Sequence, residues 1–217
     1  MDWSMNWLVF RIHDEILAEY LRDFARGRLL DIGCGESTYK DLCAESVDVY
    51  YGFDHPATKH NPSFISFWAD AKNIPIKSSS IDTILCTAVL EHVDDPGLVI
   101  AECTRILARG GHCIISAPFF WHIHEPPRDF YRFTRYGIEH LLEKNGLRIV
   151  KIKPLSGFWV TFCQEFLYYL RRFEKWVVLK ALIRCVGWCI QSSAYWMNRY
   201  DHSEGFTWMY MAVAKKM

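Results

Sequence analysis

Net charge and a membrane-length apolar run are both missing from this sequence. Its 217 residues contain 25 basic and 25 acidic side chains, so the formal charge is zero. No polycation is available to hold nucleic acid by counterion release, and we expect no nucleic-acid partner. The longest uncharged stretch of the aromatic-rich C-terminal part, residues 185–198, is shorter than the roughly 20 residues that a spanning helix needs. Because Asp2 and Arg11 interrupt the first residues, we expect neither a signal peptide nor an anchor there.

Cysteine pairs are missing as well. The eight cysteines include no CxxC pair, and most lie in apolar runs, where a free thiol behaves as a small hydrophobic group. We therefore expect reduced cysteines and a cytoplasmic location rather than a disulfide framework.

Alternating periodicities predict an α/β protein with a largely parallel sheet. Residues 12–24 have helical spacing, and Asp95 with Pro96 begins a helix that Gly110 and Gly111 would end. Thr134 begins another helix, and Gly146 ends it. Strands are expected at residues 28–33, 49–53, 64–68, 81–87, 112–117, 147–153 and 206–214, with a helix from about residue 37.

The zero net charge hides a division along the chain. Residues 1–150 have a net charge of −6, and residues 151–217 have a net charge of +6. The second part also holds 15 of the 34 aromatic residues, counted from residue 155. Polar positions recur at helical intervals through residues 158–200, which predicts two or three amphipathic helices with wide apolar faces.

A glycine-rich turn follows the first expected strand in LLDIGCGES, residues 29–37. Such a turn between a strand and a helix lets a ligand approach backbone amides closely. Thr38 stands where the third glycine of a dinucleotide-binding GxGxxG would be, which disfavours a nicotinamide-dependent dehydrogenase. The acid that ends the strand, Asp31, indicates a different ligand.

At this point the sequence resembles the class I S-adenosylmethionine-dependent methyltransferases. LLDIGCG is similar to the first motif of that family, and YGFD, residues 51–54, is similar to the second. WADAKNIPIKSSSIDTILCTAVLEHVDDP, residues 68–96, resembles the third and fourth motifs, and RILARGGHCIISAP, residues 105–118, resembles the helix, double-glycine turn and fifth strand. The motifs occur in the family's order.

The resemblance implies S-adenosyl-L-methionine as cofactor and S-adenosyl-L-homocysteine as product. Asp31 would orient the ammonium group, and Asp54 would accept both ribose hydroxyls, since a carboxylate offers two acceptor oxygens. Asp70 would face the adenine amino group, and Arg11 would hold the methionine carboxylate unless it is a solvated surface arginine. The implied cofactor-binding residues are Arg11, Asp31, Gly33, Cys34, Gly35, Asp54, Asp70, Ala71 and Thr87.

The fold implied by the resemblance is a Rossmann-like α/β sandwich. Its seven-stranded sheet is mostly parallel, with an antiparallel last strand and a helical insertion between strands 6 and 7. We therefore expect a single domain, 1–217, with an N-terminal helical cover (1–27), a cofactor-binding core (28–154), the helical insertion (155–204) and a final strand (205–217).

The segment FFWHIHEPPRDFYRFT, residues 119–134, follows the fifth strand, where open α/β sheets bind ligands. It resembles a signature of a bacterial and archaeal branch of these enzymes that is associated with sugar, cell-surface glycan or natural-product modification. A histidine is a natural base near neutral pH, so His124 and then His92 are the candidate catalytic bases.

The same segment supplies the candidate acceptor-binding residues His122, Tyr131 and Arg132. A structural alternative is that His124 hydrogen-bonds the loop, that Asp129 pairs with Arg132 and that Thr134 caps a helix. A metal site at His122, His124 and Glu125 lacks a further ligand pair at the required spacing, so no metal is expected.

Three hypotheses fit the insertion at residues 155–204: a lid over an apolar or aromatic acceptor, a homodimer interface, or a basic amphipathic surface on a membrane near a lipid-linked acceptor. The expected activity is methyl transfer to a small-molecule acceptor of the glycan, lipid-linked or natural-product type, with oxygen favoured over nitrogen. The alternative is a fold-retaining S-adenosylmethionine-binding protein without turnover that acts as a partner or scaffold.

Overall fold

The computed structural model describes residues 3–58, 60–174, 177–201 and 203–217. The chain divides into two compact units. Unit 1 comprises residues 1–17, 119–122 and 154–209, and unit 2 comprises residues 18–118, 123–153 and 210–217. The predicted single domain is not tested by this division and stays a prediction.

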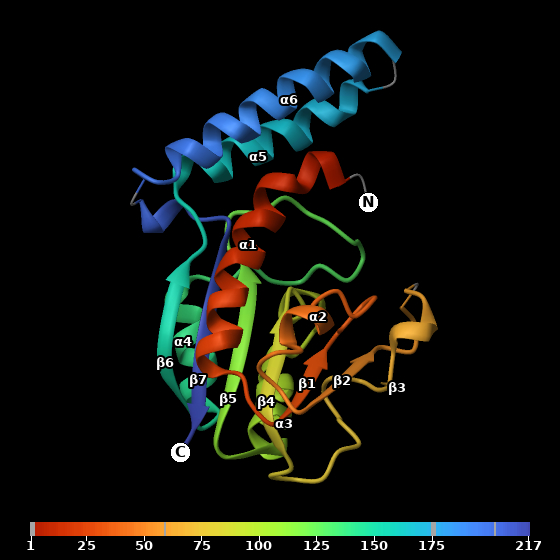
Figure 1. The fold of residues 1–217 in the computed structure, drawn as a ribbon, viewed down its shortest axis with the longest axis vertical. Helices are drawn as coiled ribbons and strands as arrows, with labels where there is room; N and C mark the ends of the chain where they lie inside the picture. Colours follow the sequence, from red (N-terminus) through yellow and green to blue (C-terminus); the bar gives the residue numbers. More distant parts are fainter. Residues whose placement is uncertain (1–2, 59, 175–176, 202) are drawn as a thin grey trace. The chain divides into compact units, whose positions relative to one another are not determined.

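Unit 2 is built around a seven-stranded sheet in the order β3-β2-β1-β4-β5-β7-β6. The strands are β1 Arg28–Ile32, β2 Val49–Asp54, β3 Phe67–Trp68, β4 Ile81–Thr87, β5 Leu107–Pro118, β6 Leu147–Pro154 and β7 Met209–Lys216. The pairs β3·β2, β2·β1, β1·β4 and β4·β5 are parallel, and Figure 1 shows β7 running opposite to its neighbours. The predicted α/β class and mostly parallel sheet are therefore confirmed.

Helices cover both faces of this sheet, which explains why its central strands contain continuous buried apolar runs such as Ile84 to Cys86 and Cys113 to Ile115. α3 (Pro96–Ile106) and α4 (Arg135–Lys144) lie behind the sheet in Figure 1, and residues 18–24 of α1 (Trp3–Phe24) lie in front. β4 and β5 supply much of the core, with Ile84, Leu85 and Ile114 fully buried.

Four local predictions differ from the structure. The strand expected at residues 64–68 is only Phe67–Trp68, because Phe64 belongs to a 3-10 turn at Pro62–Phe64. α1 begins at Trp3 and is much longer than the predicted 12–24. The helix expected from residue 37 is only α2, Lys40–Cys43, because Ser37 has a φ of +53° and belongs to the preceding turn. Gly110 and Gly111 do not end α3, since the helix stops at Ile106 and the chain continues directly into β5.

Unit 1 contains a helical hairpin of α5 (Phe158–Leu170) and α6 (Val177–Met197), which confirms helices in the insertion (Figure 1). Short 3-10 turns lie at Arg171–Phe173 and Glu204–Phe206. Two buried glutamines fix the first half of α1 in this unit. Gln164 donates to the Met5 carbonyl oxygen at 2.9 Å, and Gln191 accepts from the Leu8 amide at 3.0 Å.

Among the helices that the structure describes, none is long and apolar enough to cross a membrane.

Candidate functional site

The carboxyl ends of three neighbouring strands meet at one edge of the unit 2 sheet. Ile32 of β1 pairs with Phe53 of β2, and Asp54 pairs with Trp68 of β3. Because parallel strands end on the same side, the loops that follow them enclose a common space. A pocket of about 600 Å³ lies there. Its lining residues are Ile32, Gly33, Phe53, Asp54, His55, Ala57, Thr58, His60, Ala69, Asp70, Ala71, Ala88, Val89, His92, Val93 and Glu125 to Arg128.

The glycine turn after β1 needs its glycines. Gly33 and Gly35 have φ values of +66° and +55°, a region that other residues rarely adopt. A Cβ on Gly33 would lie 2.6 Å from the side chain of Val89, so a larger residue would clash across the pocket wall. The turn therefore presents bare backbone to the pocket.

Asp54 is held in place by two backbone amides. One carboxylate oxygen, Oδ1, accepts from the His55 amide at 2.6 Å, and Oδ2 accepts from the Gly35 amide at 3.2 Å. Oδ2 also lies 3.1 Å from Nδ1 of His60. These contacts orient the carboxyl group at the end of β2, where a vicinal diol could take the place of the His60 ring.

Asp70 and Ala71 form a turn on the neighbouring wall of the pocket. Oδ1 of Asp70 accepts from the Lys72 amide at 2.9 Å, and the Asn73 amide donates to the Asp70 carbonyl oxygen at 2.9 Å. The structure thus brings Gly33, Asp54, Asp70 and Ala71 to one pocket, and Gly35 contacts that pocket's Asp54 through its amide, although their roles in holding a cofactor stay predictions.

Asp31, Cys34 and Thr87 lie near this pocket in the fold but are not among its lining residues. Asp31 is buried beneath the glycine turn, and Tyr50 donates a 2.6 Å hydrogen bond to its Oδ2. Burial raises the pKa of the Asp31 carboxyl to about 7. Burial likewise raises the pKa of the Cys34 thiol to about 11, and Thr87 ends β4 beside Ser116 of β5.

Two of the predicted histidines meet at the pocket. The rings of His92 and His124 lie 4.7 Å apart in an edge-to-face arrangement, and His92 lines the pocket whereas His124 does not. Nδ1 of His92 donates to the Arg128 carbonyl oxygen at 2.5 Å, which leaves the lone pair on Nε2. Desolvation first, then the neighbouring His92, lowers the pKa of His124, so its ring is favoured in the neutral form.

A buried carboxylic acid, Glu91, accompanies these histidines. Its Oε1 lies 4.0 Å from Nε2 of His92, and neither carboxyl oxygen has a hydrogen-bond partner among the described residues. Burial raises the pKa of Glu91 to about 8. Glu91, His92 and His124 each place one potential ligand atom within 4.8 Å of the others, a different group from the His122, His124 and Glu125 considered in the sequence.

The loop after β5 is fixed by its own ion pairs, as the structural alternative states. Arg132 donates to both oxygens of Asp129, at 2.6 and 2.8 Å, and Asp129 also accepts from the His124 amide at 2.8 Å. Thr134 caps α4 through the Gly137 amide. The hydroxyl of Tyr131 donates to the Asp94 carbonyl oxygen at 2.8 Å. Neither Tyr131 nor Arg132 lines a described pocket.

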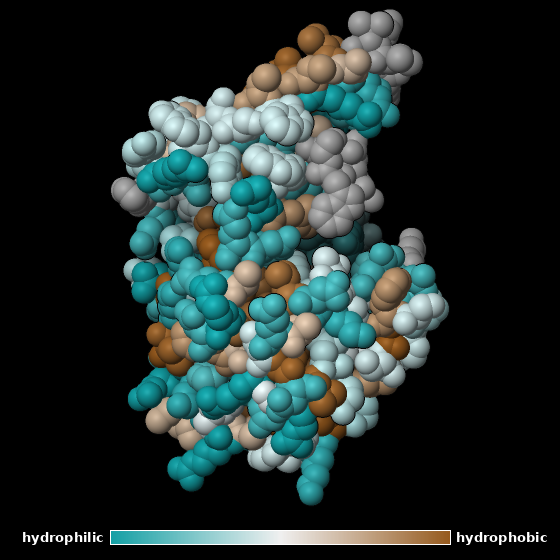
Figure 2. All heavy atoms as spheres, viewed as in Figure 1, coloured by the Kyte–Doolittle hydropathy of each residue, from teal (hydrophilic) through white to brown (hydrophobic). Residues whose placement is uncertain are grey.

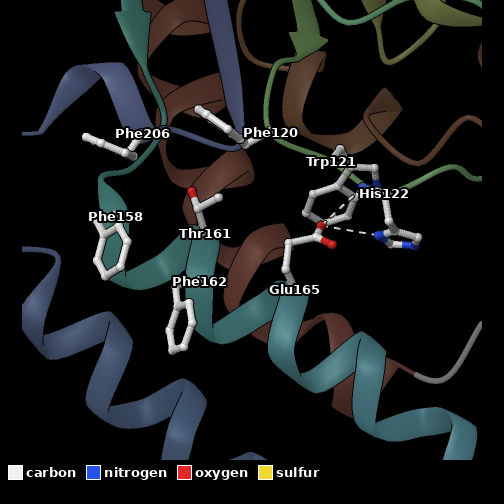
Figure 3. Close-up of a pocket in the computed structure, with 8 residues that line it drawn as sticks. All are labelled: Phe120, Trp121, His122, Phe158, Thr161, Phe162, Glu165 and Phe206. Atoms are coloured by element: carbon white, nitrogen blue, oxygen red, sulfur yellow. Dashed lines mark hydrogen bonds and ion pairs between the residues drawn. The ribbon is translucent and has the colours of Figure 1, made fainter.

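A second pocket, of about 480 Å³, lies within unit 1 (Figure 3). Aromatic side chains dominate its wall, and one polar pair stands at one side, where Nδ1 of His122 donates to Oε1 of Glu165 at 3.2 Å. The lining residues are Phe120, Trp121, His122, Phe158, Thr161, Phe162, Glu165 and Phe206. The structure therefore places His122 in a different pocket from His92.

Arg11 also belongs to unit 1. Its guanidinium lies 2.9 Å from Oε1 of Glu15 and over the rings of Trp7 and Tyr195. Its predicted role at the methionine carboxylate and the surface-arginine alternative both stay predictions.

Several lining residues were missed by the sequence reasoning. Ala88, Val89 and Val93 follow β4 inside the motif that was matched, and only the neighbouring Thr87 was selected. Ala88 has a φ of +52°, a sharp turn that apolar residues do not signal in a sequence. His60 lies in a loop without periodicity, so no sequence pattern indicated that it would lie beside Asp54.

Comparisons with known proteins agree with this geometry. Residues 8–152 match the family model of a methyltransferase domain. A ubiquinone biosynthesis O-methyltransferase of Psychrobacter arcticus is 28% identical over 130 residues, which cover 53% of this chain and 48% of that protein. The chain spans about half the length of the curated relatives it matches.

Two solved structures share the fold. The first is the [4+2]-cyclase SpnF, with a TM-score of 0.63 and 15% identity over 93% of this chain and 81% of that one. The second is the phosphoethanolamine N-methyltransferase 2 of Haemonchus contortus in complex with S-adenosyl-L-methionine, with a TM-score of 0.61 and 15% identity over 99% of this chain and 56% of that one. The fold is that of the class I S-adenosylmethionine-dependent methyltransferases. The chain belongs to the methyltransferase-domain family.

Proposed function

We propose that this chain transfers a methyl group from S-adenosyl-L-methionine to an oxygen of a small-molecule acceptor. The observation that carries the proposal is the unit 2 pocket, in which a bare glycine turn and the oriented carboxylates of Asp54 and Asp70 line one space. The ubiquinone O-methyltransferase relative supports oxygen as the acceptor atom.

The pocket residues suit this cofactor chemically. Asp54 presents an oriented carboxylate for two hydroxyls, and Asp70 presents an acceptor beside the small Ala71, which leaves room for a flat ring. Above them the Gly33 turn has no side chain, and a Cβ would meet Val89. When bound, S-adenosyl-L-methionine supplies an electrophilic methyl group on a sulfonium.

The task left to the protein is to position the acceptor and remove its proton. His92 is the better candidate for the base, because it lines the pocket and its Nδ1 is committed to the Arg128 carbonyl. His124 is the first candidate base from the sequence, and its ring packs against the ring of His92. The amide of His124 donates to Asp129, and its ring lies near the same carboxylate, so we assign His124 a positioning role.

The acceptor is proposed to carry an apolar or aromatic part. Taken by itself, the unit 1 pocket suits a ligand with such a part, because most of its wall is aromatic and its polar pair, His122 with Glu165, can hydrogen-bond a hydroxyl or amine. A concave wall of aromatic side chains contacts flat or extended apolar groups over a large area.

Calorimetric titration with S-adenosyl-L-homocysteine tests the cofactor site. We expect Asp54→Ala to weaken binding by at least tenfold, because two donors lose their acceptor, and Asp23→Ala, which removes a remote exposed carboxylate, to bind as the parent does. Equal affinities for the parent and Asp54→Ala would contradict the proposed cofactor site.

Mass spectrometry of a screen against hydroxylated apolar metabolites tests the transfer itself. A product heavier by one methylene is expected with the parent, and His92→Ala is expected to lose about 10² to 10⁴ in turnover with little change in cofactor affinity. Tight cofactor binding with no methylated product from any acceptor would favour the non-catalytic alternative.

A further inference from the structure

The α5–α6 hairpin ends in a segment whose side chains combine exposed rings with positive charge. We call residues 169–174 and 179–184 the hairpin tip. Tyr169 and Phe173 of the tip are 57% and 44% exposed, and Leu182 on the opposite helix is 57% exposed. Exposed large apolar side chains on both helices at one end are costly in water unless something covers them.

These exposed rings continue a stripe along one side of α5. Phe158, Phe162, Phe166, Tyr169 and Phe173 follow at helical intervals, and successive rings lie 5.6 to 6.2 Å apart in the pairs 158–162, 162–166 and 169–173. The first two line the unit 1 pocket, whereas the last two belong to the tip. The tip is therefore a surface separate from that pocket.

Positive charge is concentrated in the same segment. Residues 169–184 contain five basic residues and one acidic residue, a net charge of +4, while the whole chain is neutral. Among the described side chains, Arg171, Arg172 and Lys180 are exposed. The Arg172 guanidinium lies 5.1 Å from the ring centre of Tyr169 and 5.7 Å from that of Phe173.

We propose that the hairpin tip docks into the interface of an anionic lipid bilayer. Tyrosine, phenylalanine and leucine side chains insert their apolar parts at the boundary of the acyl chains, and nearby arginine and lysine side chains pair with anionic headgroups. A second copy of this chain would place +3 against +3 at the tip, whereas an anionic bilayer complements both the charge and the apolar surface. Figure 2 shows hydrophobic and hydrophilic side chains next to one another over the hairpin.

Sedimentation with sucrose-loaded vesicles tests the docking on the full chain. We expect binding to vesicles that contain phosphatidylcholine and phosphatidylglycerol in a ratio of about two to one. Binding to pure phosphatidylcholine vesicles should be weaker, and the affinity for anionic vesicles should fall as the salt concentration rises. The variant Tyr169→Ser/Phe173→Ser should lose at least tenfold in affinity, since two rings no longer insert. Arg171→Glu/Arg172→Glu should lose about fivefold for each positive charge removed, and more for the reversal.

Tyr136→Ser is the matched control, because Tyr136 is 76% exposed on α4 in unit 2 and lies outside the tip. It should bind vesicles as the parent does. S-adenosyl-L-homocysteine titration of every variant reports whether unit 2 is folded, and far-ultraviolet circular dichroism reports whether the hairpin helices of unit 1 are retained, so a lost vesicle signal cannot be attributed to misfolding. The proposal does not depend on methyl transfer, and its failure would leave the proposed function intact.

A second measurement uses the native thiols. Cys185 and Cys189 are exposed on α6 just beyond the tip, whereas the other six cysteines are buried. With Cys189→Ser, a polarity-sensitive fluorophore on Cys185 should shift to the blue when anionic vesicles are added. Three results would overturn the proposal: no binding to anionic vesicles at low salt, binding that ignores loss of both rings, or a self-association in ultracentrifugation that Tyr169→Ser/Phe173→Ser abolishes.

Discussion

Two buried carboxyl groups in unit 2 are held near their protonated form, and both lie at the functional region. Asp31 has one hydrogen-bond donor, Tyr50, and Glu91 has none among the described residues. Burial is the first cause of the raised pKa of each, to about 7 and about 8. Such a carboxyl group is costly to ionise when no ligand is bound. A cationic ligand that binds beside it would stabilise its ionised form.

Cofactor binding should therefore depend on pH through Asp31. The ammonium group of S-adenosyl-L-homocysteine favours the ionised carboxylate, so below pH 7 a proton must leave on binding. The affinity should fall by up to about tenfold for each pH unit below 7 and level off above it. Calorimetry between pH 5.5 and 8.5 would show this slope, and Asp31→Asn should bind more weakly with a nearly flat profile. A slope that persists in Asp31→Asn would assign the dependence to another group.

Stability should vary with pH in the opposite sense through Glu91. Its pKa is higher in the folded state, so the stabilising difference is full below the unfolded pKa of about 4.5 and is lost as pH rises to about 8. Urea unfolding from pH 4.5 to 8.5 should show the parent losing stability over this window, and Glu91→Gln should lose less because it cannot ionise. The pKa of Asp129 is lowered, chiefly by its hydrogen bond with Arg132, so protonation of Asp129 changes the stability only at more acidic pH. If the free energy of unfolding changed equally with pH in Glu91→Gln and in the parent, Glu91 would not be the cause of the pH dependence.

At the scale of single elements, helix boundaries were predictable where a side chain fixes them. Asp95 accepts from the amides of Gly97 and Leu98, and Thr134 accepts from the amide of Gly137, so both helices begin where the sequence indicates. These capping contacts are local and join residues two or three positions apart.

Boundaries that depend on tertiary contacts were not predictable in this way. Gly110 and Gly111 look like a helix stop, yet they lie within β5, where a Cβ on Gly111 would lie 2.8 Å from the Asp82 carbonyl oxygen of β4. The glycine is required by the close approach of two strands, a constraint that only the fold reveals. His60 beside Asp54 and the pocket wall at Ala88 have the same origin, because loop conformation rather than periodicity places them.

The stabilising effect of the Asp95 N-cap of α3 can be tested by mutation. Asp95→Ala removes the acceptor for two amides at 3.0 and 3.3 Å and should cost about 1 kcal/mol of unfolding free energy. Asp23→Ala, which removes an exposed acid from the last turn of α1, should change stability by less than about 0.5 kcal/mol. Urea unfolding at pH 7 compares the two. A loss for Asp95→Ala no larger than that for Asp23→Ala would mean that water replaces the cap at no cost.

At the scale of the whole molecule, the charge division along the sequence does not follow the two units. Each unit is neutral, since unit 1 contains seven acidic and seven basic residues and the remaining charges of unit 2 balance as well. The positive charge of the C-terminal part is instead concentrated in the hairpin tip, with a net charge of +4 over residues 169–184. Because this positive charge lies at the hairpin tip and not around the unit 2 pocket, we expect the cofactor and the bilayer to bind to separate surfaces.

Hydrogen exchange on the full chain can separate these two surfaces. S-adenosyl-L-homocysteine should slow amide exchange in the segments that line the unit 2 pocket, because it orders backbone that Gly33, Gly35 and Ala88 hold in turns. The hairpin tip, residues 169–174 and 179–184, has no part in that pocket and should exchange as before, whereas anionic vesicles should protect the tip and leave the pocket segments unchanged. In Asp54→Ala only the first response should weaken, and in Tyr169→Ser/Phe173→Ser only the second. Protection of the tip by S-adenosyl-L-homocysteine alone would instead make the hairpin a cover that responds to the cofactor, and the two surfaces would then act as one.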